Sequence, residues 1–220
     1  MNRATQITTS AMGVLAGLAG LEHGIGEVLQ GDRIPGGVMI QSWPESESFQ
    51  VLNGEPAMTL LPTLRIAGVV TILFALIFLV WATLLIQRPR AGLALTALSI
   101  TLLLVGGGFG PPLLGLIVGT TATRIHAPLT WWRARFSPGV RSFLAMFWPW
   151  AFAACLTAWL YLFPGSILFA AFLGVNEPIL LSVAVAIFAA FGLLLLTLVC
   201  AFARDLRRQP VAYRTPAGAW

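Results

Sequence analysis

Long apolar runs separated by short polar or basic segments dominate this chain of 220 residues. The clearest run, "IAGVVTILFALIFLVWATLLI", lies between Arg65 and Arg88 and contains no charged residue. A helix of about twenty such residues spans a hydrocarbon core of about 30 Å, whereas a core helix of a soluble protein keeps a polar face. The pattern therefore predicts an all-α integral membrane protein built as a helical bundle.

The apolar runs predict about six crossings within a single membrane domain that covers residues 1–220. Polar segments separate these crossings: an outer loop at 31–63, a basic cytoplasmic loop at 124–141 and a cytoplasmic tail at 204–220. The predicted crossings cover residues 7–30, 64–87, 91–106, 111–124, 142–163 and 179–203.

The stretch 91–123 is too long for one ordinary crossing, since a continuous helix of this length would measure about 50 Å. It contains "GGGFGPP", whose glycines and prolines predict a helix break. Two arms of about 15 residues would reach only about 23 Å each, so the stretch forms either a thin hairpin of two crossings or a re-entrant pair. Irregular backbone at membrane depth requires cover by protein or a wet cavity. The candidate break comprises Gly106, Gly107, Gly108, Gly110, Pro111 and Pro112.

The distribution of charge favours a membrane protein over a nucleic-acid-binding one, despite a formal net charge of +5. Only 10% of the residues are charged, against about 25% in a soluble domain, and no RNA- or DNA-binding motif is present. Every basic residue is an arginine, and all except Arg33 and Arg65 fall on one side of the predicted bundle. Cytoplasmic loops carry such an excess of basic residues. We therefore predict a multi-pass protein of the cell membrane with both termini in the cytoplasm.

The first crossing has an alternative interpretation as a cleaved signal peptide. The segment "MNRATQITTSAMGVLAGLAG" carries one positive charge, a weakly apolar middle and small residues near positions 17 to 20, as signal peptides do. We expect the segment to stay, because helical periodicity aligns its glycines on one stripe that lets another helix approach closely. This glycine stripe is also the predicted face for a homo-oligomer or a partner membrane subunit, and it consists of Gly13, Gly17, Gly20 and Gly24.

Ionisable residues interrupt the outer part of the first crossing in the motif "LEHGIGE", which contains Glu22, His23 and Glu27. On a helix, Glu27 falls on the glycine stripe, His23 on its edge and Glu22 nearly on the opposite side. Ionisable groups within a crossing are candidates for function, although their shallow position also fits boundary residues or an interhelical hydrogen bond. Together with Glu177 of "NEP" and the glycine break, they predict an outward-facing polar site. Such a site can handle protons, since imidazole titrates near neutral pH.

The sequence predicts no metal and no cofactor. His23 and Glu27 share a helix face, as metal-ligand pairs do, but a metal needs three or four ligands. His126, the only other histidine, falls on the opposite side of the predicted membrane. Carboxylates of the same motif or of the outer loop would have to complete a site, and no spacing requires it. Cys155 and Cys200 lie within apolar runs without a metal-binding spacing, which fits small buried apolar side chains.

Three motifs, "LEHGIGE", "NGEPAM" and "GGGFGPP", resemble those of uncharacterised multi-pass membrane proteins of prokaryotes over about residues 15–125. The resemblance implies a membrane location and brings no known activity. No nucleophile–histidine–acid arrangement, kinase motif or haem-attachment motif is present in the sequence. We therefore expect a small transporter or permeation protein rather than an enzyme. The alternatives are an accessory or assembly subunit of a membrane complex and, third, a membrane-embedded enzyme that uses Glu22 and His23.

Overall fold

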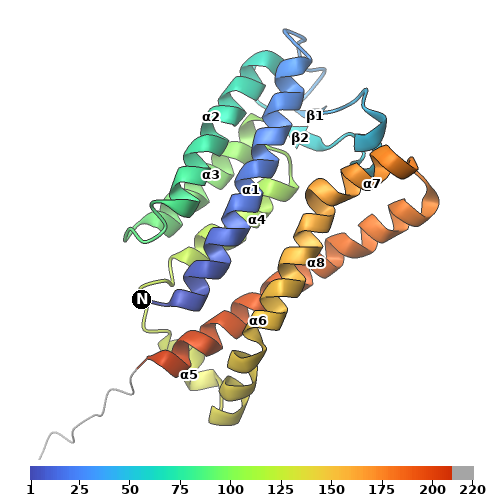
Figure 1. Cartoon of the computed structure of the whole chain (residues 1–220). Helices are drawn as coiled ribbons and strands as arrows, with labels where there is room; N and C mark the ends of the chain where they lie inside the picture. Colours follow the sequence, from blue (N-terminus) through green and yellow to red (C-terminus); the bar gives the residue numbers. More distant parts are fainter. Residues whose placement is uncertain (210–220) are drawn as a thin grey trace, which may run out of the picture.

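The computed structural model describes residues 1–209, so the predicted tail beyond Gln209, with Arg214, lies outside the described part. The described chain is mostly helical, with little β-structure (Figure 1). Residues 31–63 contain a small hairpin of β1 (Met39–Gln41) and β2 (Pro56–Met58), with the 3-10 helix η1 (Glu47–Leu52) between the strands. A kinked segment, η2 (Tyr161–Gly165), in which Phe163 has extended backbone angles, interrupts the helical stretch Pro138–Leu173. The α-helices are α1 (Arg3–Leu29), α2 (Leu64–Thr83), α3 (Ala91–Val105), α4 (Gly110–Ala122), α5 (Thr130–Arg135), α6 (Pro138–Leu160), α7 (Ser166–Leu173) and α8 (Glu177–Arg208).

Within residues 1–209, four helical segments are long and apolar enough to cross a membrane, namely α1, α2, the α6–α7 stretch over Pro138–Leu173, and α8. The predicted all-α class is therefore confirmed, and the four candidate spans support a membrane protein. α3 and α4 are shorter apolar helices of 15 and 13 residues, which corresponds to about 23 and 20 Å. Six crossings would require both of these short helices to span the membrane, and this count stays a prediction.

The glycine motif separates α3 from α4, since α3 ends at Val105 and α4 begins at Gly110. Pro111 and Pro112 occupy the first turn of α4, where a helix does not need the backbone N–H that proline lacks. The two helices pack against each other and run in opposite directions (Figure 1). The stretch is thus a hairpin whose turn lies at one end of the bundle.

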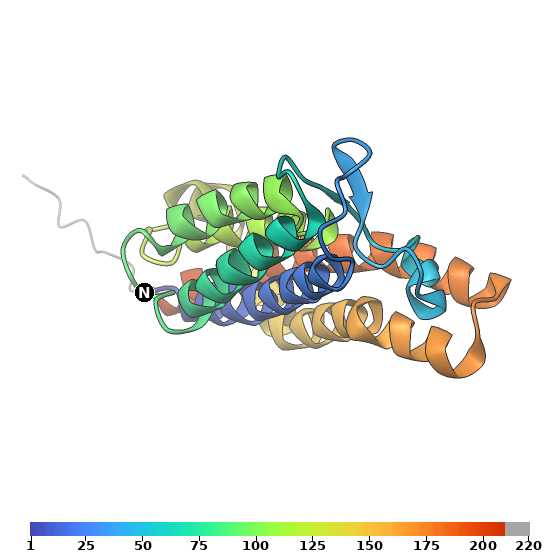
Figure 2. The same ribbon diagram turned by 90° about the horizontal axis from the view of Figure 1, so that it is seen from above.

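The connections gather at two opposite ends of the bundle (Figures 1 and 2). The first, which we call the basic end, holds the amino terminus, the α2–α3 turn, the connection through α5 and the end of α8. The second, which we call the cap end, holds residues 31–63, the α3–α4 turn and α7. Apart from Arg33 and Arg65, the arginines of the described chain belong to segments of the basic end. A cytoplasmic position of that end follows from the positive-inside rule and stays a prediction.

α1 is the central helix, since it packs against α2 and α4 and also contacts α6 and α8. At the basic end, α8 caps its first turn. The buried carboxylate of Asp205 accepts hydrogen bonds from the backbone N–H groups of Ala4 (2.9 Å) and Thr5 (2.8 Å) and from Thr5 Oγ1 (2.7 Å). A carboxylate at a helix amino terminus satisfies free N–H groups and favours the helix dipole. These hydrogen bonds therefore connect α8 to the amino terminus of the central helix.

The glycine stripe of α1 packs against α2 of the same chain. A Cβ on Gly24 would lie 2.9 Å from the carbonyl oxygen of Gly68, and a Cβ on Gly13 would lie 2.8 Å from the Cβ of Ala82. Small residues permit this close approach of two helices. Because α2 covers the stripe, a homo-oligomer or a partner subunit, which stays a prediction, would need another surface.

We expect Gly68→Ala to lower the unfolding temperature of the detergent-purified protein much more than Gly20→Ala. A Cβ at position 68 would lie 2.6 Å from the backbone nitrogen of Val28, whereas at position 20 the nearest atom is the Cβ of Ala75, at 3.5 Å. Overpacking costs about 1–3 kcal/mol, while alanine is favoured over glycine in a helix by about 0.5–1 kcal/mol. Similar unfolding temperatures for the two variants would show that α1 and α2 are not packed in this way.

Cysteines introduced at Ser46 in the cap-end loop and at Ser137 before α6 should react with a membrane-impermeant thiol reagent from opposite sides of the membrane. The native Cys155 and Cys200 are buried and give little background reaction. We expect position 46 to be labelled in intact cells and position 137 only after the membrane is opened. Labelling of both positions from one side would overturn the predicted orientation.

Candidate functional site

Residues 31–63 form a cap over the end of the bundle and are fixed to the end of α3. Leu60 donates its backbone N–H to the carbonyl oxygen of Leu104 (3.1 Å), and Thr59 Oγ1 donates to the carbonyl oxygen of Val105 (3.3 Å). These carbonyl groups lie in the last turn of α3, which has no further helical N–H groups to bind them. The cap therefore completes the hydrogen bonding of α3 and is held in place by it.

His23 lies beneath the cap, in the middle of a buried group of acidic side chains. Its Nδ1 is 3.2 Å from Oε2 of Glu22, 3.1 Å from Oε2 of Glu55 and 3.0 Å from the carbonyl oxygen of Ala19. An imidazole nitrogen carries at most one hydrogen atom. Nδ1 therefore cannot satisfy all three of these oxygen atoms with good hydrogen bonds.

Glu55 reaches His23 from the cap through a left-handed turn of the backbone. Asn53, Gly54 and Glu55 all have positive φ values of 55°, 66° and 53°, and Asn-Gly sequences favour such turns. The side chain of Glu55 is only 7% exposed. Burial raises the pKa of the Glu55 carboxyl well above its usual value, although the nearby His23 acts in the opposite direction.

Gly106 and Gly108 form the floor of this region, below Glu27 and His23. Both glycines have positive φ, of 125° and 76°, a conformation that other residues rarely adopt. A Cβ on Gly106 would collide with the carboxylate of Glu27, and a Cβ on Gly108 would collide with Nε2 of His23. The α3–α4 turn therefore needs glycine for backbone conformation and for space, and it makes room for two ionisable side chains of α1.

Glu27 is fully buried, and neither of its carboxylate oxygens has a hydrogen-bond donor among the described residues. In the same part of the chain, both oxygens of Glu22 and Oε2 of Glu55 also lack a hydrogen-bond donor. Burial of an unpaired carboxylate costs several kcal/mol, and a single imidazolium balances only one negative charge. The group of three carboxyls and one imidazole, which we call the acidic cluster, therefore needs additional protons or a bound cation.

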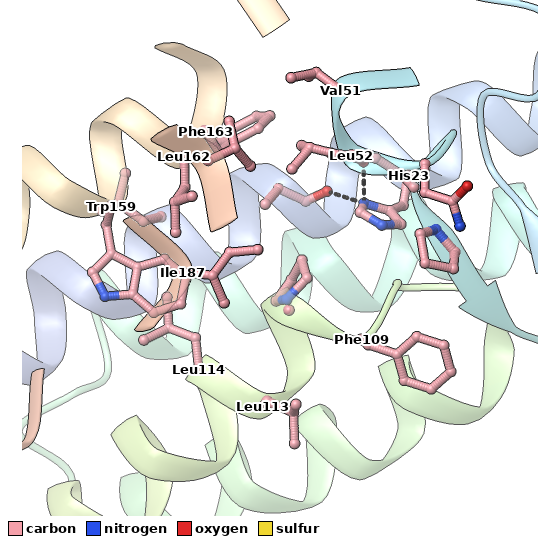
Figure 3. A pocket seen from close by; sticks show the side chains of 18 of the residues that line it. His23, Val51, Leu52, Phe109, Leu113, Leu114, Trp159, Leu162, Phe163 and Ile187 are labelled. Carbon is pink, nitrogen blue, oxygen red and sulfur yellow. Dashed lines mark hydrogen bonds and ion pairs between the residues drawn. The ribbon is translucent and has the colours of Figure 1, made fainter. Parts of the chain in front are cut away.

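A cavity of about 710 Å³ opens beside the acidic cluster (Figure 3). It lies between α1 and α4 on one side and α6, η2 and α8 on the other, with η1 at the cap end. His23 and Glu55 are the ionisable residues in its wall, and most of the remaining wall is apolar, with Leu114, Trp159 and Ile187 among its side chains. This size and lining are typical of a site for a small organic molecule.

The structure groups three of the four predicted site residues and leaves out the fourth. Glu22, His23 and Glu27 lie together at the cap end, next to the glycine break. Glu22, which the helical arrangement predicted nearly opposite the stripe, instead turns toward His23. Glu177 is exposed in the first turn of α8 and is not one of the residues that line the cavity.

One member of the acidic cluster, Glu55, was missed in the sequence. It belongs to "NGEPAM", a motif that the sequence singled out without assigning a residue to the site. The Asn-Gly pair before it signals a tight turn. That turn is a local hint that the following carboxylate points back toward the bundle.

We expect Gly108→Ala to destabilise the protein by about 2 kcal/mol or more, because alanine disfavours positive φ and its Cβ would collide with His23. Gly110→Ala is the matched control: Gly110 lacks a positive φ, and among the described residues no atom lies within 4 Å of its Cβ position apart from its chain neighbours and the backbone of its own helix. Thermal unfolding in detergent compares the two variants. Equal unfolding temperatures would contradict the placement of the α3–α4 turn against α1.

Comparison of the chain with protein-family models, with curated proteins and with solved structures finds no match. The acidic cluster and the adjoining cavity are the observations that bear on the function of the chain.

Proposed function

We propose that this membrane protein is a small transporter whose outward-facing site binds an amphiphilic molecule. The observation that carries the proposal is the cavity beside His23 and Glu55, an apolar chamber within the bundle with its ionisable groups at the cap end. An apolar chain would gain free energy by burial in this chamber. The polar head of the same molecule would then reach the acidic cluster, so both parts of an amphiphile find a matching surface.

Contacts between the cavity and the basic end support an outward-facing arrangement. Trp148 Nε1 donates to Thr8 Oγ1 (3.1 Å), and the sulfur atoms of Cys155 and Met12 lie 3.8 Å apart. These contacts close α1 against α6. The hydrogen bonds from the first turn of α1 to the carboxylate of Asp205 hold α8 against the same helix. Access from the cap end is thus favoured over access from the basic end.

The arrangement of helices offers a way to open and close such a site. The α1–α4 group and the α6–α8 group diverge toward the cap end (Figure 1), where η1 contacts α7. Transporters commonly expose a central site to alternate sides by moving one helix group against another. In this chain the α1–α8 and α1–α6 contacts near the basic end are the ones that such a movement would break.

The charge of the acidic cluster favours a head group with a positive charge or a hydrogen-bond donor. Three carboxyl groups face a single imidazole, and their free oxygens are acceptors. An ammonium group would form charge-assisted hydrogen bonds with them, which are about twice as strong as neutral ones. A carboxylate head group would instead add a further negative charge.

The two alternative functions stay predictions. The accessory-subunit alternative drew on the glycine stripe as a docking face, and α2 covers that stripe. A membrane-embedded enzyme would use the same acidic cluster, with its substrate in the cavity. A transporter binds its substrate without a reaction, so tight binding of an unreactive amphiphile would support the transporter and would require no catalytic step.

In chelator-treated protein in detergent, we expect native mass spectrometry to retain dodecylamine more strongly than dodecanol, and dodecanol more strongly than dodecanoic acid. Leu114→Trp should fill the cavity and weaken dodecylamine binding by about tenfold or more, which corresponds to a loss of about 1.4 kcal/mol. Ala184→Trp tests the same cavity from α8, where Ala184 is exposed and a larger side chain disturbs the core less.

Leu76→Trp is the control, because Leu76 lies on the exposed face of α2, away from the cavity. It should bind dodecylamine as the unchanged protein does. The proposal is overturned if both cavity variants bind dodecylamine as strongly as this control, or if the unchanged protein retains none of the three molecules.

A further inference from the structure

We propose that Glu22, His23 and Glu55 hold a divalent transition-metal ion such as Zn²⁺. One donor atom from each residue lies within 4.8 Å of the other two. Two ligands come from consecutive residues of α1, and the third comes from the cap. A metal at this position would therefore connect the cap to the central helix. The proposal does not depend on what the adjoining cavity binds.

The separations of the imidazole nitrogen from the two carboxylates are close to those within a coordination sphere. Nδ1 of His23 is 3.2 Å from Oε2 of Glu22 and 3.1 Å from Oε2 of Glu55. Zinc binds nitrogen and oxygen ligands at about 2.0–2.2 Å, and the edge of a tetrahedron with such bonds is about 3.3–3.6 Å. The two nitrogen–oxygen separations need to grow by only a few tenths of an ångström to receive the ion.

The hydrogen bonding of the acidic cluster independently indicates a missing cation. The side chain of Glu55 is more than nine-tenths buried, and its Oε2, which points at the other two ligands, has no hydrogen-bond donor among residues 1–209. Both carboxylate oxygens of Glu22 likewise have no hydrogen-bond donor in this part of the chain. A metal bound through Nδ1 needs no hydrogen atom on that nitrogen. Metal binding would thus satisfy the carboxylate oxygens that a single N–H group cannot.

The ligand set selects the type of ion. One imidazole with two carboxylates suits zinc, iron or manganese, whereas Mg²⁺ and Ca²⁺ prefer oxygen ligands alone. Three protein ligands leave a coordination position open, as in catalytic rather than structural zinc sites. His23 and Glu55 also line the cavity, so the open position faces a space that water or a ligand can enter. Glu27, one helical turn beyond His23, adds a further negative charge close by.

The sequence predicted no metal because it showed no third ligand at a required spacing. The fold supplies that ligand, because it places Glu55 against His23 of α1. The two residues are 32 positions apart in the sequence. Such a long-range contact has no regular spacing for a motif to record. The contact between Glu55 and His23 is therefore the observation that the structure adds.

The test uses the full chain in detergent, stripped with a chelator, passed through gel filtration and titrated with Zn²⁺. We expect one zinc per chain by elemental mass spectrometry, and cobalt substitution should give visible absorption bands of a low-coordinate site. Glu55→Gln and His23→Gln should weaken zinc binding by more than about tenfold. Even the loss of a residue that only hydrogen-bonds to a metal ligand commonly lowers metal affinity about 10–100-fold. Glu45→Gln is the matched control, because Glu45 belongs to the same loop and its side chain is 80% exposed.

Glu55→Gln keeps the shape of the side chain and gives the oxygens of Glu22 a donor, so its metal-free form should unfold no earlier than the unchanged protein. This variant keeps the test informative if His23→Gln does not fold. The proposal is overturned if the unchanged protein binds no zinc, or if Glu55→Gln binds zinc as tightly as Glu45→Gln. Neither an amine nor any other candidate ligand of the cavity is added in the titration, so failure here leaves the transporter proposal to its own test.

Discussion

The close approach of the α3–α4 turn to α1 is the contact on which the cap end depends. Two glycines of the turn let its backbone lie directly against the carboxylate of Glu27 and the imidazole of His23. The turn follows Val105, whose carbonyl oxygen accepts a hydrogen bond from Thr59 in the cap. Because Thr59 comes directly after β2, the same turn also fixes the strand that begins beside Glu55. A side chain at either glycine would displace α1, α3 and the cap together.

Two kinds of buried carboxylate occur on or against α1, and they differ in how they are satisfied. Asp205 accepts three hydrogen bonds from the first turn of α1, so its burial stabilises the bundle. Glu27 accepts none from the described chain, and Glu22 and Glu55 keep oxygens without donors. A buried acceptor without a donor costs about 1–3 kcal/mol, and more when it is charged. Their incomplete pairing at the cap end therefore points to a ligand or a proton, since functional sites commonly retain such unfavourable groups.

Local pattern predicted the helices well and the site only in part. Apolar runs and glycine spacing are set by neighbouring residues, so the membrane helices could be read from the sequence. The orientation of Glu22 could not, because helical periodicity assumes one buried face and the cap covers a second. Glu55 required a long-range contact that no motif records. Glu177 lies apart from these residues: Asn176 caps α8 by accepting the N–H of Ile179, and Glu177 is exposed in the first turn that follows, outside the cavity wall. Its part in a site stays a prediction.

The two proposals meet at the polar end of the cavity, where the sign of the charge decides which head group can bind. Without a metal, three carboxyl groups and one imidazole attract a cation or a hydrogen-bond donor. An ion held by Glu22, His23 and Glu55 would neutralise the two carboxylates that bind it and would weaken that preference, because its open coordination position would accept an anionic oxygen. The apolar walls stay the same in both cases, so they select for an apolar chain and not for a head group. The occupancy of the acidic cluster, rather than the shape of the cavity, therefore sets the chemistry of the ligand.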